Sequence, residues 1–412
     1  MLPTSWRPTP GGDSLTATSP APARALRRRP PAGSLFDDDP GRASSPCVQT
    51  AVAPLSRKEP RTPDRAPPLA RVRGLLTIAP ARVDHIPAFR IAVGLAIPMA
   101  VLLLTDRIEF AMYVGFGAFT GIYSRYEPTR ARFRRQLLAG SMFTVCVTIG
   151  AAVAQLAPRT PETLSSWVVI LVGALVAGGS AILVTSRGLK PGGAIFPVFA
   201  TAAVASAPSV APFWTAGLIV ASVVALCVLL GLLGHWAGER HPDVVLGRDH
   251  EDVTRAELGA EFTRYFVAAL VAGAIGLASG LPFPYWAQVA AVAPLASPGH
   301  GARIEKGVHR LVGTVLGVGV TAFLLSFPAE PWQLVVWVVL LQFLAEMFIL
   351  RNYSIALLFI TPLALLMVQL GHPQPAGPML QARVLETAIG VVVGLALVLG
   401  RYARERRSAL AA

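Results

Sequence analysis

The chain has 412 residues, of which 53% are hydrophobic and only 14% are charged, and its formal net charge is +13. Soluble domains usually carry about 25% charged residues, so this composition excludes a typical soluble globular protein. The basic residues are dispersed over an N-terminal tail and over alternate loops. This distribution excludes a nucleic-acid patch and favours contact with a lipid bilayer.

Residues 1–85 hold 15 of the 35 prolines and show no sustained apolar period. Such a segment buries too little apolar surface to offset the loss of chain entropy, so we expect a disordered, basic, cytoplasmic tail. No apolar run follows its basic start, which argues against a cleaved signal peptide. Within the tail, Leu69–Val83 is interpreted as a linker, with a segment lying on the membrane surface as the alternative.

Apolar runs long enough to cross roughly 30 Å of hydrocarbon recur after residue 85. They predict an all-α polytopic membrane protein with about 12 transmembrane helices, several of them short enough to be re-entrant or tilted. In the first half we expect helices at 86–104, 109–124, 136–157, 166–184, 193–207 and 213–236. In the second half we expect them at 262–280, 285–297, 311–327, 332–350, 353–370 and 382–401.

The basic residues alternate between loops. Arginine and lysine are concentrated in every second loop and at the C-terminus, which by the positive-inside rule places both termini in the cytoplasm, with the plasma membrane as the expected location. An even number of spans in each half keeps this alternation intact.

The two halves resemble each other. The run Gly234–His241 (GHWAGERH) is similar to Gly400–Arg407 (GRYARERR), 166 residues further along the chain. We therefore predict two parallel six-helix repeats, at 86–241 and 262–407, joined by a cytoplasmic linker at 242–261. Pro197 and Pro362 interrupt the fifth helix of each half. Paired breaks of this kind point to a binding site, and a kink that serves only packing is the alternative.

A motif in the second half resembles a known family. Residues 282–287 read PFPYWA, and Arg310–Gly317 reads RLVGTVLG. This pattern is similar to the fusaric acid resistance family of integral membrane transporters, which is related to aromatic acid exporters. The resemblance covers residues 86–407, is weaker in the first half, and implies export of organic, often aromatic, carboxylic acids. Larger members add a soluble domain, which the short loop between the two halves cannot hold.

Several cationic and aromatic residues are candidates for contact with an anionic substrate, because a guanidinium can hold a carboxylate through two hydrogen bonds. Topology anchoring and contact with lipid phosphates are the alternative for the arginines, and membrane-interface belt residues the alternative for the aromatic pair. The substrate-binding candidates are Arg90, Arg135, Arg264, Arg310, Arg383, Tyr285 and Trp286.

Glu346 is the most conspicuous acid of the predicted membrane segments, with Gln342 one turn earlier on the same face. A carboxylate in hydrocarbon costs several kcal/mol unless it is paired or protonated, so Glu346 is our first candidate for proton coupling. A structural ion pair with Arg351 is the alternative. Glu386, three residues after Arg383, is a further candidate, and a solvated rim is the alternative for that pair.

These features predict a secondary transporter that exports small organic anions across the lipid bilayer. A passive organic-anion channel and a non-transporting membrane scaffold are the alternatives. No HExxH, Walker A, GxSxG or metal-spaced His/Cys motif is present, so we expect no enzyme activity, no cofactor, no metal and no nucleic-acid partner. Assembly into a homo-oligomer is left open.

Overall fold

The computed structural model describes residues 79, 84–156, 162–239 and 253–411, and these residues form helices and connecting loops without any strand. The prediction of an all-α protein is therefore confirmed for this part of the chain. The predicted tail, including Leu69–Val83, lies almost entirely outside the described residues.

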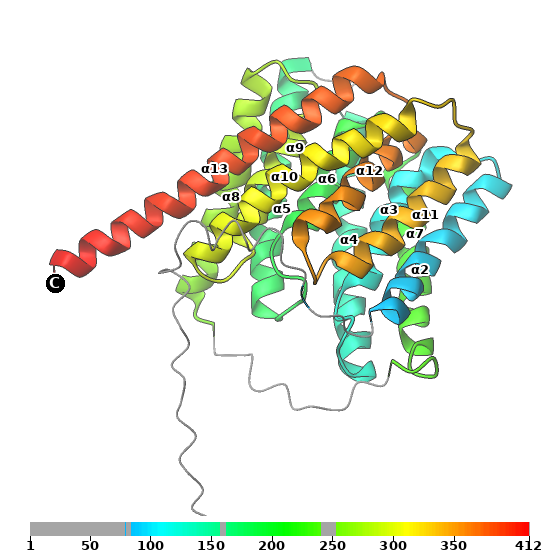
Figure 1. Cartoon of the computed structure of the whole chain (residues 1–412), viewed down its shortest axis with the longest axis horizontal. Coiled ribbons are helices and arrows are strands. Elements are labelled where there is room, and N and C mark those ends of the chain that lie inside the picture. The colour runs from blue at the N-terminus through cyan, green and yellow to red at the C-terminus, as the bar shows by residue number, and fades with distance from the viewer. Residues whose placement is uncertain (1–78, 80–83, 157–161, 240–252, 412) are drawn as a thin grey trace, which may run out of the picture. The chain divides into compact units, whose positions relative to one another are not determined.

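Twelve helical segments follow one another along the described residues (Figure 1). The first six are α2 (His85–Leu104), α3 (Ala111–Ala118, flanked by the 3-10 turns η2, Ile108–Phe110, and η3, Phe119–Ile122), α4 (Thr129–Leu156), α5 (Glu162–Ser186), α6 (Ile195–Ser206) and α7 (Phe213–Leu233). The second six are α8 (Arg255–Ala278), α9 (Tyr285–Leu295), α10 (His300–Leu325), α11 (Pro331–Phe348), α12 (Tyr353–Gly371) and α13 (Ala376–Ala411).

Nine of these helices are long and apolar enough to cross a membrane, counted over the described residues. The α3 segment, α6 and α9 are shorter, and at 1.5 Å per residue α6, with 12 residues, rises about 18 Å, less than the hydrocarbon thickness. The sequence correctly predicted short second and fifth helices, except that α12 has 19 residues. Pro197 lies in the first turn of α6, where a missing N–H costs nothing, so the predicted interruption is present only at Pro362, inside α12.

Several helices begin earlier or end later than the apolar runs predicted. α4 and α10 start at Thr129 and His300, before their first apolar runs, and α13 continues to Ala411. Charged residues such as Arg and Lys are good helix formers, so a helix continues past the hydrocarbon region that hydropathy detects. Arg135 and Arg310 consequently lie inside helices and not at loop–helix junctions.

Caps fix two of these boundaries. The Thr254 side chain accepts a hydrogen bond from the Glu257 backbone N–H at 3.2 Å, while the Glu257 carboxylate accepts one from the Thr254 N–H at 2.8 Å. This capping box starts α8. The Asn352 side chain accepts a hydrogen bond from the Ile355 N–H at 3.1 Å and starts α12 in the same manner.

The contacts between helices correspond in the two sets. α4 packs on α6 and α7, and α10 packs on α12 and α13, which also lies beside α9 (Figure 1). Across the sets, α5 packs on α8 and α2 on α11, so the fourth helix of each set contacts the first helix of the other. In the same way α6 packs on α9 and α12 on α3. These matched pairs support the predicted duplication, which stays a prediction.

Glycines allow close helix approaches. A Cβ on Gly313 would lie 2.7 Å from the Ser354 carbonyl oxygen of α12, and a Cβ on Gly390 would lie 2.2 Å from the Ala287 carbonyl oxygen of α9. Only hydrogen fits at these positions, so α10 packs directly on α12 and α13 directly on α9.

Candidate functional site

A cavity of about 520 Å³ lies between the two sets of helices. Its walls come mainly from α3, α6, α9 and α12, the second and fifth helices of each set, which also contact one another across the sets. Polar side chains reach it from α10, α11 and α13. The volume is within the roughly 300–1,000 Å³ of small-molecule sites.

Three cations from the second set of helices line this cavity: Lys306, Arg310 and Arg383. Arg310 and Arg383 are 4% and 1% exposed. Arg310 donates to the Tyr353 hydroxyl at 3.2 Å, and Lys306 lies 5.3 Å from the centre of the same ring. Among the residues that the structure describes, no carboxylate lies within ion-pair distance of any of the three cations. Within the described residues these three cations thus lack a direct carboxylate partner, whereas Glu346 and Glu127, which also line the cavity, pair with Arg125 and Arg135.

Arg383 has the least satisfied side chain of the three. Its guanidinium carbon lies 3.7 Å from the centre of the Trp286 ring, which is a close cation–π contact. Its buried Nε and Nη1 atoms have no hydrogen-bond partner among the residues that the structure describes. Buried donors are normally satisfied, so these two N–H groups are available to an acceptor oxygen that enters the cavity.

Aromatic rings form the wall beside Arg383. Trp286 lies 4.7 Å from Tyr285 and 4.8 Å from Phe199 between ring centres, and Phe199 continues to Phe116 at 5.0 Å. Tyr285 and Trp286 are 3% and 1% exposed, which excludes the membrane-interface belt considered from sequence. Trp286 faces the cavity, whereas Tyr285 supports it from behind.

An ion pair between the two sets of helices lines the cavity. Arg125 Nη1 lies 2.8 Å from Glu346 Oε2, and Gln342 donates to the other carboxylate oxygen of Glu346 at 3.1 Å. The alternative considered from sequence, an ion pair of Glu346 with Arg351, does not form among the described residues, because Arg351 pairs with Asp84 at 3.0 Å. Arg351 follows the end of α11.

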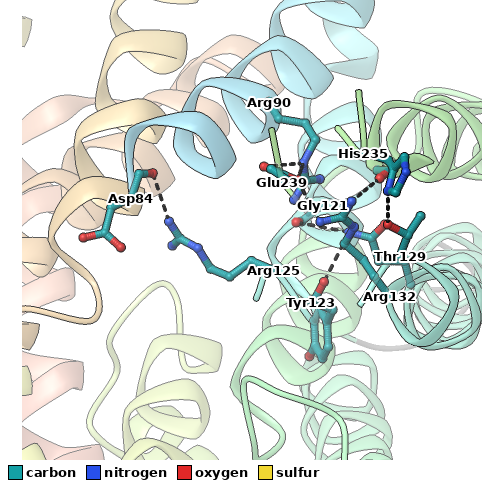
Figure 2. A network of polar contacts seen from close by, with 11 residues as sticks. Asp84, Arg90, Gly121, Tyr123, Arg125, Thr129, Arg132, His235 and Glu239 are labelled. Atoms are coloured by element: carbon teal, nitrogen blue, oxygen red, sulfur yellow. Dashed lines mark hydrogen bonds and ion pairs between the residues drawn. The ribbon is translucent and has the colours of Figure 1, made fainter. Parts of the chain in front are cut away.

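Asp84 connects this ion pair to the start of α2. Its backbone oxygen accepts a hydrogen bond from Arg125 Nη2 at 3.4 Å (Figure 2), and its carboxylate accepts one from the Tyr126 hydroxyl. Burial alone would raise the pKa of Asp84, but the bonds from Tyr126 and Arg351 and the charge of Arg125 hold this pKa below its ordinary value. Asp84 is therefore ionised at neutral pH.

Arg90 belongs to a separate buried network (Figure 2). Its Nε lies 3.1 Å from a carboxylate oxygen of Glu239, and Arg132 Nη1 lies 2.8 Å from the same oxygen. Arg132 also donates to the Gly231 carbonyl oxygen at 2.6 Å. Thus α2, α4 and the end of α7 are joined through one carboxylate, and Arg90 does not line the cavity.

Arg135 and Arg264 lie at a second hollow of about 410 Å³, together with Arg303 and Lys190. Arg135 pairs with Glu127, and Arg264 pairs with Glu261. Basic residues that the sequence assigned to alternate loops, or to helix ends next to them, thus meet at one end of the helices, as the positive-inside reading requires. Only Lys190 among these four cations also lines the central cavity.

Glu386 lies outside the lining of the cavity, next to the aromatic wall. Its Oε1 accepts a hydrogen bond from the Phe283 N–H at 3.0 Å, and its Oε2 has no partner. Glu386 and Arg383 are both almost completely buried, which excludes a solvated rim. The two side chains do not form an ion pair within the part of the chain that the structure describes.

The structure thus brings five of the predicted site residues to the cavity and adds others that sequence reasoning missed. The five are Arg310, Trp286, Arg383, Gln342 and Glu346. The missed residues of the cavity are Lys306 and Arg125. Glu239 and Arg132, which were also missed, belong to the separate network of Arg90. Lys306 stands one turn before Arg310 on the same helix, and this spacing could have identified it. Glu239 belongs to the repeated end motif GHWAGERH, the only sequence feature that pointed to it.

The helices and the charged, aromatic cavity define a multi-pass, all-α membrane protein. Residues 270–397 match the model of a family described as fusaric acid resistance protein-like, so the resemblance is confirmed over this region. The matched region includes Trp286, Lys306, Arg310, Glu346 and Arg383, that is, most of the polar side chains of the cavity.

Two curated relatives share about a third of the chain. The "Uncharacterized membrane protein YvaC" of Bacillus subtilis is 31% identical over 133 residues, which are 32% of this chain and 21% of that protein. The "Uncharacterized protein slr1298" of Synechocystis sp. is 30% identical over 135 residues, 32% of this chain and 18% of that protein. The match therefore spans about a fifth of each relative's length. No solved structure matches the chain.

Proposed function

We propose that the protein is a secondary transporter that exports small aromatic carboxylic acids across the plasma membrane, with both termini in the cytoplasm. The observation that carries this proposal is the pair of partnerless buried N–H groups of Arg383 beside the Trp286 ring. A carboxylate would satisfy the guanidinium and an aromatic ring would lie against the aromatic wall.

The positive charge of the cavity selects for anions. Lys306 and Arg310 line the same space as Arg383, so an anion that enters gains charge-assisted hydrogen bonds in a site of low dielectric constant. Counting from the helix starts at His300 and Ala376, Arg310 lies about 15 Å along α10 and Arg383 about 10 Å along α13. Both arginines line one cavity although α10 and α13 are predicted to start on opposite sides of the membrane, which supports a substrate site between the two ends of the helices, as in other transporters.

The Arg125–Glu346 ion pair supplies a gate for this cavity. It joins the loop after η3 to α11, so opening the pair separates the first set of helices from the second. Protonation of Glu346 would remove its attraction for Arg125 and release the gate, which couples opening to a proton. Glu386, with one partnerless carboxylate oxygen, is the second proton-coupling candidate.

The test uses the purified chain in proteoliposomes loaded with a labelled aromatic acid such as benzoate. We expect efflux to depend on the chain, to respond to a pH gradient, and to fall in Arg310→Gln. Arg107→Gln, which changes an exposed arginine that does not line the cavity, is the matched control. Equal efflux from Arg310→Gln and the native chain would contradict the proposal. Efflux that never exceeds the distribution set by the membrane potential, about 2.3 kcal/mol per charge per 100 mV, would identify a passive channel instead.

A further inference from the structure

The second hollow contains more positive charge than its carboxylates compensate. Its lining includes four cations, Arg135, Lys190, Arg264 and Arg303, and one carboxylate, Glu261. Arg135 pairs with Glu127, which lies outside the lining, and Arg264 pairs with Glu261, whereas no carboxylate of the described residues lies within ion-pair distance of Arg303. The charge of Arg303 fits an anion in the hollow.

The shape of the hollow comes from small residues at the ends of the helices. Gly188, Gly192 and Gly193 of the α5–α6 loop line it opposite Ala296 and Ser297. Gly193 has a φ of +85°, and a Cβ there would lie 2.6 Å from the Ala296 side chain and 2.9 Å from the Tyr265 hydroxyl. The close approach of this loop to α8 and α9 therefore requires glycine.

The predicted repeat has a corresponding place in the other half, where charged side chains pair with one another. The end of α11, the start of α2 and the loop before α4 form this place and contribute the Arg125–Glu346 and Asp84–Arg351 ion pairs. Sequence alignment of the halves places Ala181 where the second half has Glu346. The side chains at the place formed by α11, α2 and the loop before α4 thus neutralise one another, whereas the second hollow stays open and basic.

Apolar helix faces lead to the hollow from the membrane side. α5 and α8, whose ends line the hollow, expose Leu171 and Leu175 and Val271 and Ile275, each between 39% and 47% accessible. In a multi-pass membrane protein such faces contact lipid tails. An anion bound in the hollow would lie at the end of helix faces that lipid tails cover, which is the position of a phospholipid headgroup.

We propose that this hollow is a site for the phosphate group of an anionic phospholipid, separate from the central cavity. Arg303 and Arg264 bind the phosphate oxygens, with Arg135 and Lys190 nearby, while the acyl chains lie along α5 and α8. Arg303 already donates from Nε to the Ser297 carbonyl oxygen at 3.0 Å, which holds its guanidinium beside the hollow and leaves its two Nη groups for the ligand.

The experiment counts lipids bound to the purified full chain by native mass spectrometry in detergent, with phosphatidylglycerol and phosphatidylcholine as probes. We expect phosphatidylglycerol to bind preferentially, Arg303→Gln to weaken it about fivefold, and the double variant R264Q/R303Q to weaken it further, since each basic residue at a membrane surface contributes about that factor. Arg303→Lys retains the charge and should restore most of the binding, which separates loss of charge from misfolding.

Arg134→Gln is the matched control, because Arg134 is an exposed neighbour of Arg135 that does not line the hollow. Inorganic phosphate in a separate arm distinguishes the two sources of a phosphate group. Displacement of the lipid by millimolar phosphate would show a free-anion site and overturn the lipid assignment. Equal binding of both lipids, or equal losses in Arg134→Gln and Arg303→Gln, would overturn the site itself.

Discussion

The buried arginines of the first six helices are paired with carboxylates, whereas the cations that line the cavity from the last six are not. Arg90 and Arg132 share Glu239, and Arg125 reaches Glu346. Lys306 and Arg383 lie over aromatic rings, and Arg310 donates to the Tyr353 hydroxyl. Pairing in a low dielectric fixes a charge in place, so the paired set holds helices together and the unpaired set is available to a ligand.

The largest effect is expected from Glu239→Gln, which leaves Arg90 and Arg132 buried without a counter-charge. Breaking a buried pair by removing one partner costs about 3–5 kcal/mol. The unfolding midpoint in detergent measures this loss. Glu109→Gln, which breaks the more exposed pair with Arg107, should change stability by less than about 1 kcal/mol. Similar losses of stability in both variants would show that the buried network around Glu239 stabilises the protein no more than a more exposed ion pair does.

Arg383→Gln tests the unpaired set. Because a hydrogen bond to a charged group contributes about 1.5–3 kcal/mol, we expect efflux of an aromatic acid to slow by roughly 10- to 100-fold while stability changes little or improves. Efflux from proteoliposomes and the unfolding midpoint are measured on the same preparation. A large loss of stability with unchanged efflux would reverse the roles of the two sets.

Glu346→Gln tests a residue that has properties of both sets, because Glu346 is paired with Arg125 and also lines the cavity. Glutamine retains a hydrogen-bond acceptor but binds no proton. We expect efflux to change by only a few-fold and to lose its response to the pH gradient. If the response persists, Glu346 is only a structural partner of Arg125, and the same measurement on Glu386→Gln follows.

The smallest effect is expected from Asp84→Asn. The pKa of Asp84 is lowered in the folded protein. The stabilisation that its ionised carboxylate contributes is therefore complete above the pKa of the unfolded chain, about 3.9, and is lost as the pH falls through the lower pKa of the folded protein. The stability difference from the native chain should therefore be constant from pH 5 to 8, at about 1 kcal/mol, and should shrink below about pH 4. A difference that varies between pH 5 and 8 would contradict this assignment.

The sequence predicted the helices and part of the cavity because hydropathy and short-range motifs report local properties. Arg310, Trp286 and Glu346 were identified from their neighbours in the chain, and all three line the cavity. Helix ends were less accurate, since α10 begins with charged turns that hydropathy does not detect.

The pairing of charges could not be predicted from the sequence. Arg125 and Glu346 are separated by 221 positions, and Arg90 and Glu239 by 149. Only the packing of α2 on α7 and α11 brings these residues together. For the same reason the sequence could not separate Arg90, which is paired, from Arg383, which is not.

The central claim is that the unpaired cations of the cavity bind an aromatic carboxylate. Calorimetric titration of the purified chain with benzoate and with benzamide, which lacks the charge, tests this claim most directly. We predict that benzoate binds at least about tenfold more tightly than benzamide, and that Arg383→Gln removes this preference. Equal binding of the two ligands, or an unchanged preference in Arg383→Gln, would contradict the claim.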